Sequence, residues 1–412
     1  MKVFLLILLG SFFIEILQGQ NVTFYNVNIV DVAEGTIVPG RTVVVENGII
    51  TKISKAKKHI KSGQADRSGC YMMPGLIESH SHWGNFSFNE KIMQQMADSF
   101  LECGVTTVRD AGGKADVAKQ YSRRLEQGEI TGPTVYLSSF WVGPDYKLQD
   151  SVEHVWERTI PYDATVGQLE QFILEAKEFG CWGVKLYNDL SYEMLQKIVP
   201  LCHKHGLRPW GHFATSPASA LECVRAGIET VSHAYLIEEM EGFTEEGRAK
   251  RYTPEKIAYR DSVYREMVKR GTILDATTKL CSQEDAALYV NTVFTKDAYQ
   301  AGVKIAAGTD CVDFDHGNRC LLLEEMNILH DSCGMNIPDV LRAATTTGAE
   351  VLGLSGKLGI IKKGAEADIL LLKSNPLVSL VALSKEKEVY VNGKKVYGDS
   401  VFCRRKPCLI CK

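Results

Sequence analysis

Two histidines separated by one residue, His80 and His82, close a short apolar segment of the sequence. On a β-strand, residues i and i+2 point to the same side, so both imidazoles can reach a single metal ion. His203 and His205 have the same spacing, but they close a helical pattern that stops at Gly206. Helical side chains two positions apart diverge by about 200°, so we interpret this second pair as structural.

Four further side chains with metal-binding chemistry also lie at the ends of apolar segments. They are Lys185, His212, His233 and Asp310. A lone histidine in an apolar segment is most often a hydrogen-bonded core residue. Six metal-compatible positions at segment ends instead favour one common site, and we predict a metal centre that activates water for hydrolysis.

The elements that must position these residues alternate between strands and helices over residues 74–364. Eight segments are expected as strands: 76–82, 106–110, 134–139, 183–187, 208–212, 230–234, 272–277 and 304–310. Amphipathic segments between them are expected as helices, and several end at glycine; examples are 90–103, 192–205 and 217–226. Eight such units predict an α/β fold of the TIM (β/α)8 barrel type.

A TIM barrel gathers the C-terminal ends of its strands at one mouth, where active sites form. The six candidate ligands close the first, fourth, fifth, sixth and eighth predicted strands, so a barrel would bring them together. A doubly wound open sheet is the alternative. It usually carries a glycine-rich phosphate loop, which this sequence lacks, and it explains the ligand placement less well.

The two ends of the chain have a different pattern from the middle. Residues 20–73 and 365–400 contain short alternating apolar runs, separated by turn signals such as Asn47-Gly48. Because two distant β-rich segments most simply pair with each other, we predict that they form one small composite β-sandwich domain beside the barrel.

The composition describes a globular chain with room for both domains. Its 412 residues are 45% hydrophobic, which excludes disordered and fibrous classes. The net charge is -3 and the isoelectric point is near 6.4. Without a basic stripe interleaved with aromatic residues, nucleic acid is excluded as a partner, and a small-molecule substrate is expected.

Residues 1–19 are predicted to be a secretory signal peptide, with Lys2 ahead of an apolar run that ends near Gly19. The run is shorter than the roughly 20 residues that span a membrane, so an uncleaved anchor is less favoured. Sequons at Asn21 and Asn85 agree with export. We therefore expect a secreted, extracellular protein that has no membrane contact after signal removal.

Twelve cysteines also agree with an oxidising compartment. Residues 401–412 form a Cys-rich tail, in which we expect Cys403, Cys408 and Cys411 to form disulfides rather than a zinc knuckle. The cysteines in segments expected as core helices, or at their ends, are predicted to be free buried thiols. They are Cys103, Cys181, Cys202 and Cys223.

The chain resembles the amidohydrolase superfamily over nearly its whole length after the signal peptide. The motifs that carry the resemblance are MPGLIESHSH at 73–82, GVTTVRD at 104–110, GTD at 308–310 and GKLGIIKKGAEAD at 356–368. Within the superfamily, residues 211–212 and 226–235 are similar to a branch that contains imidazolonepropionase-like and prolidase-like carboxypeptidases. The resemblance implies a metal-dependent hydrolase with a TIM barrel.

The resemblance further implies two divalent ions, with zinc as the expected metal. One ion would be held by His80, His82 and Asp310, and the other by His212 and His233. An ammonium group has no lone pair, so unmodified Lys185 cannot be a ligand. The resemblance implies that its neutral amine takes up carbon dioxide and bridges both ions as a carbamate; a plain salt bridge is the alternative.

The implied mechanism needs no covalent enzyme intermediate. Two adjacent ions depress the pKa of a bridging water and polarise the scissile carbonyl. Asp310 is expected to take the proton of this nucleophile and pass it to the departing nitrogen. Tyr235 matches a family position where a hydroxyl steadies the carbonyl oxygen, although core packing is equally natural for a tyrosine there.

Substrate identity is less constrained than the metal centre. A carboxypeptidase-like enzyme must bind a free carboxylate, for which Arg109, His154 and His316 are the candidates. The third strand is not followed by the Gly-Gly-His run of bacterial dipeptidase relatives, and Glu78 stands where the family usually has aspartate. We predict hydrolysis of an amide C–N bond in a dipeptide or an N-acyl amino acid.

Other functions are compatible with the same motifs. A cyclic amide or lactone hydrolase of this superfamily is the nearest alternative, and a secreted, catalytically silent metal-binding protein is an alternative of another class. A mononuclear deaminase is less favoured, because it has no use for a carboxylated lysine. The sequence does not determine which metal is bound. It also leaves the oligomeric state open, and a homo-oligomer is one of the alternatives.

Overall fold

A computed structural model describes residues 21–61, 65–83, 90–139, 142–143, 160–238, 252–280, 285–310 and 320–398 of the chain. The predicted signal peptide, the Cys-rich tail and the side chains of Asn85, His154 and His316 lie outside these described residues. The predictions for them therefore stay predictions. Within the described residues, no helix is both long and apolar enough to cross a bilayer.

The two ends of the chain pair with each other, as predicted, in a seven-stranded sheet. Its order is β15-β14-β13-β4-β1-β2-β3. The strands from the N-terminal end are β1 (Val22–Asp31), β2 (Thr36–Glu46), β3 (Ile49–Lys55) and β4 (Tyr71–Pro74). Those from the C-terminal end are β13 (Ile369–Leu372), β14 (Lys387–Val391) and β15 (Lys394–Tyr397). β4 and β13 join the two groups by antiparallel pairing.

This composite domain differs from the prediction in its architecture. The strands belong to one mixed sheet, and its pairing does not confirm a sandwich of two packed sheets. Apolar residues of both chain ends, among them Phe24, Val43 and Ile369, share one buried cluster. Alternating side chains explain this cluster, because every second residue of a strand points to the same face.

The middle of the chain contains the eight expected strands. They are β5 (Leu76–Ser81), β6 (Val105–Asp110), β7 (Thr134–Tyr136), β8 (Gly183–Leu186), β9 (Arg208–His212), β10 (Thr230–Ser232), β11 (Ile273–Asp275) and β12 (Lys304–Ala306). Most of their residues are buried, and their pairing is parallel throughout. Parallel strands that are buried on both faces have nearly continuous apolar sequences, and this pattern is the one from which the strands were predicted.

The eight strands divide into two parallel sheets rather than one continuous closed barrel. One sheet has the order β5-β6-β7 and the other β12-β11-β10-β9-β8. Isolated bridges join the segment after β7 to β8, through Ser138 with Gly183 and Val142 with Leu186. On the other side, the amide of Ser79 in β5 donates to the carbonyl of Ala307, just after β12, at 3.0 Å.

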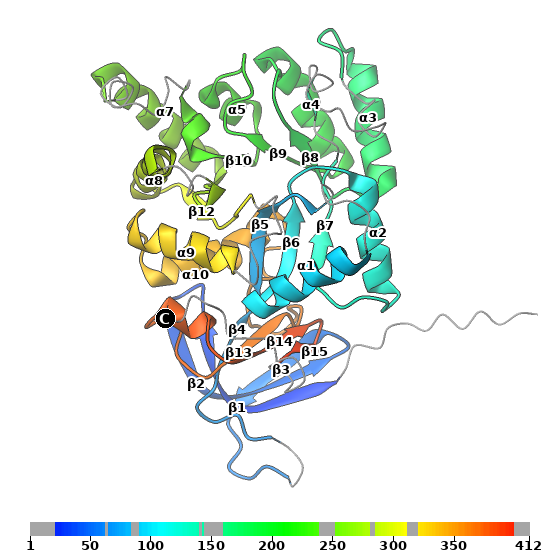
Figure 1. Ribbon diagram of the computed structural model, residues 1–412, viewed down its shortest axis with the longest axis vertical. Helices are drawn as coiled ribbons and strands as arrows, with labels where there is room; N and C mark the ends of the chain where they lie inside the picture. Colours follow the sequence, from blue (N-terminus) through cyan, green and yellow to red (C-terminus); the bar gives the residue numbers. More distant parts are fainter. Residues whose placement is uncertain are drawn as a thin grey trace, which may run out of the picture.

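Helices surround the parallel strands on the outside, and the mixed sheet lies at one end of the molecule (Figure 1). The longer helices are α1 (Glu90–Cys103), α2 (Ala115–Glu126), α3 (Val166–Phe179), α4 (Tyr192–His205), α7 (Pro254–Arg270), α8 (Asp285–Gln300) and α9 (Leu321–Asp331). The shorter ones are α5 (Ala220–Ala226), η3 (Ala234–Ile237), α10 (Ile337–Ala343), α11 (Thr346–Val351) and η5 (Leu380–Leu383).

Local sequence signals set several helix ends. Thr165 and Ser219 begin α3 and α5 with capping boxes, in which the hydroxyl accepts from a backbone amide of the first turn. Gly206 and Gly227 end α4 and α5 in the left-handed conformation.

One cysteine prediction is wrong and three are confirmed. Cys103, expected as a free buried thiol, forms a disulfide with Cys320, with the two Cα atoms 5.2 Å apart. The reason is tertiary: the end of α1 lies beside the start of α9, although the residues are separated by 217 positions in sequence. Cys181, Cys202 and Cys223 are free and buried, as predicted.

Candidate metal centre

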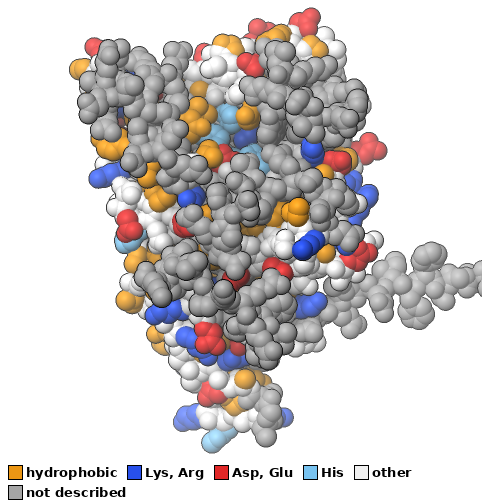
Figure 2. All heavy atoms as spheres, viewed as in Figure 1, with side chains coloured by type: hydrophobic (Ala, Val, Ile, Leu, Met, Phe, Trp, Pro, Cys, Tyr) orange, Lys and Arg blue, Asp and Glu red, His pale blue; other side chains and the backbone are white. Residues whose placement is uncertain are grey.

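Side chains from distant strands converge where the parallel strands end. A ligand atom from each of His80, His233 and Asp310 lies within 4.8 Å of the others, and all three residues are buried. The rings of His80 and His82 are 5.1 Å apart between centroids, and those of His212 and His233 are 4.8 Å apart. Histidine side chains are visible on this face, with acidic and basic atoms beside them (Figure 2).

All four histidines turn the same ring atom, Nδ1, toward an oxygen atom. The acceptors are Asp275 Oδ2 for His80 at 2.5 Å, Gly112 O for His82 at 2.8 Å, Asn188 Oδ1 for His212 at 2.9 Å and Thr277 Oγ1 for His233 at 2.8 Å. The Thr277 hydroxyl donates to the carbonyl of Ala276, so it accepts from the ring. For His80, His212 and His233, Nδ1 therefore carries the proton and Nε2 keeps the lone pair that a metal needs.

The donor set fits a divalent cation. Nε2 of His80 is buried and has no hydrogen-bond partner among the described residues, although buried polar atoms are normally paired. It lies 3.6 Å from Asp310 Oδ1, which in turn lies 2.8 Å from His82 Nε2. Imidazole nitrogens around a carboxylate are the ligands that zinc prefers.

The protonation states also suit metal binding. Burial lowers the pKa of His80 to about 4 and that of His233 to about 3, and it lowers that of His212 well below its usual value. Burial alone would raise the pKa of Asp310, but contacts with His80 and His82 outweigh it and hold the pKa below its usual range. At neutral pH the site therefore offers the uncharged imidazoles of His80, His212 and His233 and the ionised carboxylate of Asp310.

The backbone is strained at two of these positions. His233 has φ of 70° and Asp310 has φ of 51°, both in the left-handed region that residues with a side chain rarely adopt. Such strain costs of order 1–3 kcal/mol and persists only where surrounding contacts enforce it. The amide of Asp310 donates to the carbonyl of His80 at 2.9 Å, and the amide of His233 donates to that of Asp275 at 3.0 Å.

Lys185 lies on β8 and is almost fully buried, with 1% of its surface exposed. Burial, together with the nearby charge of Arg109, lowers the pKa of its ammonium group to about 8. The positive charge of Lys185 helps to keep the pKa values of His80, His212 and His233 low, which places it near these three imidazoles. Its carboxylation stays a prediction.

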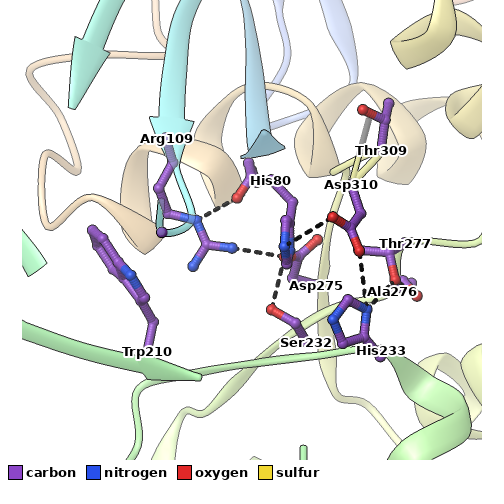
Figure 3. A network of polar contacts seen from close by, with 12 residues as sticks. His80, Arg109, Trp210, Ser232, His233, Asp275, Ala276, Thr277, Thr309 and Asp310 are labelled. Atoms are coloured by element: carbon purple, nitrogen blue, oxygen red, sulfur yellow. Dashed lines mark hydrogen bonds and ion pairs between the residues drawn. The ribbon is translucent and has the colours of Figure 1, made fainter. Parts of the chain in front are cut away.

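Arg109, predicted to bind a substrate carboxylate, is engaged within the protein. Its Nη2 donates to Asp275 Oδ2 at 2.7 Å, its Nε donates to the carbonyl of Ser79, and its guanidinium lies 5.0 Å from the centroid of the Trp210 ring (Figure 3). Arg109 is 1% exposed, while its Nη1 has no hydrogen-bond partner among the described residues. Two of its donors thus serve the protein, and a substrate contact stays a prediction.

Tyr235 lies in η3, and its ring stacks on that of His233 at 5.7 Å between centroids. Its backbone amide donates to Asn291 Oδ1 at 3.2 Å. The side chain is therefore beside the metal centre, where the predicted contact with a substrate carbonyl requires it. His203 and His205 lie elsewhere and pair with surface glutamates at 3.0 and 2.7 Å, as their interpretation as structural residues requires.

Sequence reasoning missed the residues that hold the imidazoles. Asp275, Asn188 and Thr277 were not singled out, although each accepts a hydrogen bond from a candidate ligand. A signal was present for Asp275, because a carboxylate that closes the apolar run of β11 needs a buried partner. Glu78, which was noted, accepts from the amides of His80 and Thr309, each at 2.9 Å, and burial raises its pKa to about 8.

Known proteins are similar to this chain in sequence and in fold. The chain is 24% identical to ochratoxinase of Aspergillus niger, an alignment that covers 89% of this chain and 86% of that protein. It is 32% identical to imidazolonepropionase of Bdellovibrio bacteriovorus over 124 residues, 27% of each chain. A crystal structure of a Xaa-Pro dipeptidase has a TM-score of 0.74 and 18% identity, and covers 92% of this chain and 100% of its own.

The family comparison covers most of the chain. The model of the amidohydrolase family matches residues 71–396, which include β4, all eight parallel strands and the C-terminal strands of the mixed sheet. The matched region also contains every residue of the metal centre described above. This chain therefore belongs to the amidohydrolase family.

Proposed function

We propose that the protein is a metal-dependent amidohydrolase with two divalent ions, which cleaves an amide C–N bond in a dipeptide or an N-acyl amino acid. The observation that carries this proposal is the common orientation of the four imidazoles. Each is fixed through Nδ1 to an oxygen atom, in a cluster that surrounds an ionised Asp310. A purely structural histidine has no need of an unpartnered buried Nε2, which His80 has.

The proposed ligands divide into two groups. His80, His82 and Asp310 would hold one ion, and His212 and His233 the other. Lys185 would bridge the two as a carbamate, and its lowered pKa supports this, because only a neutral amine reacts with carbon dioxide. We propose zinc as the metal, since imidazole and carboxylate are its usual ligands.

The chemistry follows from these positions. Bound divalent ions would supply a hydroxide nucleophile at neutral pH and polarise the scissile carbonyl. Asp310, ionised and at the centre of the cluster, would accept a proton from the nucleophile and donate it to the leaving nitrogen. Tyr235, stacked on His233, would donate a hydrogen bond to the carbonyl oxygen.

The substrate class and the compartment are proposed from separate observations. Two of the proteins that this chain is similar to are an ochratoxinase and a Xaa-Pro dipeptidase. From the second name we extend only the class of a dipeptide, which has an amide bond near a free carboxylate. The Cys103–Cys320 disulfide supports our proposal of an extracellular protein, because such bonds persist in oxidising compartments. We also propose that the eight parallel strands represent the TIM barrel expected from the sequence.

Turnover of a library of dipeptides and N-acyl amino acids tests the proposal. We expect chelator-sensitive hydrolysis, restored by zinc, and a loss of 10²- to 10⁴-fold in kcat for Asp310→Asn. Asp163→Asn, which removes a carboxylate from an exposed position, is the matched control and should keep full activity. Activity on ring amides or lactones alone would replace the proposed substrate class, and hydrolysis that resists complete metal removal would refute the mechanism.

A further inference from the structure

Asp275 lies at the centre of a buried polar network on a strand for which no ligand was predicted. It closes β11, and its Oδ2 accepts hydrogen bonds from His80 Nδ1 at 2.5 Å, from Arg109 Nη2 at 2.7 Å and from Ser232 Oγ at 3.1 Å. Figure 3 shows the three donors arriving at this carboxylate from different elements. Its side chain is fully buried.

The acceptor at His80 differs from those at the other three histidines. His82, His212 and His233 donate to a backbone carbonyl, an amide oxygen and a hydroxyl, all of which are neutral. Among these four Nδ1 hydrogen bonds, that of His80 is the one whose acceptor is a carboxylate. A charged acceptor makes the imidazole a more basic ligand and fixes its orientation more strongly than a neutral one does.

The surroundings keep this carboxylate in place and ionised. Arg109 contributes a positive charge that is itself held by the carbonyl of Ser79 and by contact with the Trp210 ring. Gly308 leaves the space that the pair needs: a Cβ atom there would come within 2.4 Å of Asp275 Oδ1 and 2.7 Å of His80 Cβ. An unpaired buried carboxylate is costly, so the arginine is required for Asp275 to remain at this position.

We propose that Asp275 is a positioning residue for the metal centre: it holds His80 with Nε2 directed at the ion, and Arg109 holds Asp275. The backbone of the same residue extends this role, because its carbonyl accepts from the amide of His233 at 3.0 Å. One short strand without a ligand of its own thereby orients ligands from two others. This inference rests on the proposed metal-dependent function.

The test measures zinc affinity by competition with a chromogenic chelator, on the full-length chain. We expect Asp275→Asn, which keeps the shape and removes the charge, to weaken binding of one ion by 10- to 100-fold. Asp261→Asn, at an exposed position of α7, is the matched control and should bind zinc like the wild type. Ser232→Ala removes only the longest of the three hydrogen bonds and should have a smaller effect than Asp275→Asn.

Arg109→Gln separates the positioning role from substrate binding. If Arg109 acts through Asp275, its zinc-binding defect and that of Asp275→Asn should not add in the double variant. Its KM should then rise equally for substrates with and without a free carboxylate. Additive defects, or a KM rise confined to carboxylate substrates, would contradict the proposed coupling of Arg109 to Asp275.

Two results keep this inference distinct from the proposed function. If the wild type binds no zinc, the proposed function fails; if the wild type binds zinc and Asp275→Asn binds it equally well, only the role of Asp275 fails. Should Asp275→Asn not fold, the ring tautomer of His80 in the metal-free wild type decides, measured by ¹⁵N NMR and assigned with His80→Asn. We expect the proton on Nδ1; a proton on Nε2 would overturn the inference.

Discussion

Gly308→Ala is the substitution with the most sharply defined steric consequence in the metal centre. The added Cβ would lie 2.4 Å from Asp275 Oδ1, 2.7 Å from His80 Cβ and 2.9 Å from the His80 amide. Real Cβ contacts are not this short, so β5 must move away from the segment after β12. Gly308 is not among the residues with positive φ, so the effect is steric rather than conformational.

The size of the effect follows from two terms. Overpacking of a dense core costs typically 1–3 kcal/mol, which we expect as a lower free energy of unfolding in urea. Separation of His80 from Asp275 removes the support of a ligand, and we expect a 10- to 100-fold loss of zinc affinity. Gly167→Ala is the control, because its Cβ would meet nothing within 4 Å in the first turn of α3. The free energy of unfolding of Gly167→Ala should be about 0.5–1 kcal/mol higher than that of the wild type. If Gly308→Ala keeps wild-type stability and zinc affinity, the described packing of His80 against Asp275 is refuted.

Three further predictions address other parts of the structure. Asn188→Ala removes the acceptor of His212 Nδ1 at 2.9 Å and should weaken zinc binding by 10- to 100-fold, with unchanged affinity as the contrary result. Joint replacement of Cys103 and Cys320 by serine opens a loop of 217 residues and should lower the free energy of unfolding by up to about 5 kcal/mol, visible as a lower urea midpoint. Because the pKa of Lys185 is lowered to about 8, its neutral fraction reaches one half near pH 8 and levels above about pH 9. The extent of zinc binding after reconstitution, at a fixed concentration of dissolved carbon dioxide, should follow the same pH dependence. A rise that continues toward pH 10 would indicate an ordinary lysine.

Much of the fold could be predicted because the informative signals are local. Buried parallel strands are continuous apolar runs, and helices such as α4 carry a serine before the first turn and a glycine after the last. β9 and α4 have the bounds that the pattern predicts. The pairing of strands is not local, and for that reason the single mixed sheet and the Cys103–Cys320 disulfide were not foreseen.

The candidate site divides in the same way. His80 and His203 are each followed two positions later by a second histidine. His80 lies on a strand and is a candidate ligand, whereas His203 lies at the end of a helix and pairs with Glu229 at the surface. The hydrogen-bond acceptors of the histidine Nδ1 atoms could not be found from sequence spacing, because Asp275 is 195 residues from His80 in sequence. They become apparent only when the strands are placed side by side.

The number and position of bound ions test the central claim most directly. Elemental analysis of the wild-type protein after zinc reconstitution, combined with anomalous diffraction at the zinc edge, measures both. We predict two zinc ions for each chain, one beside Nε2 of His80 and the other beside His212, with Lys185 between them. Zinc-replete protein that contains no bound ion, or ions bound only outside this cluster, would contradict the account.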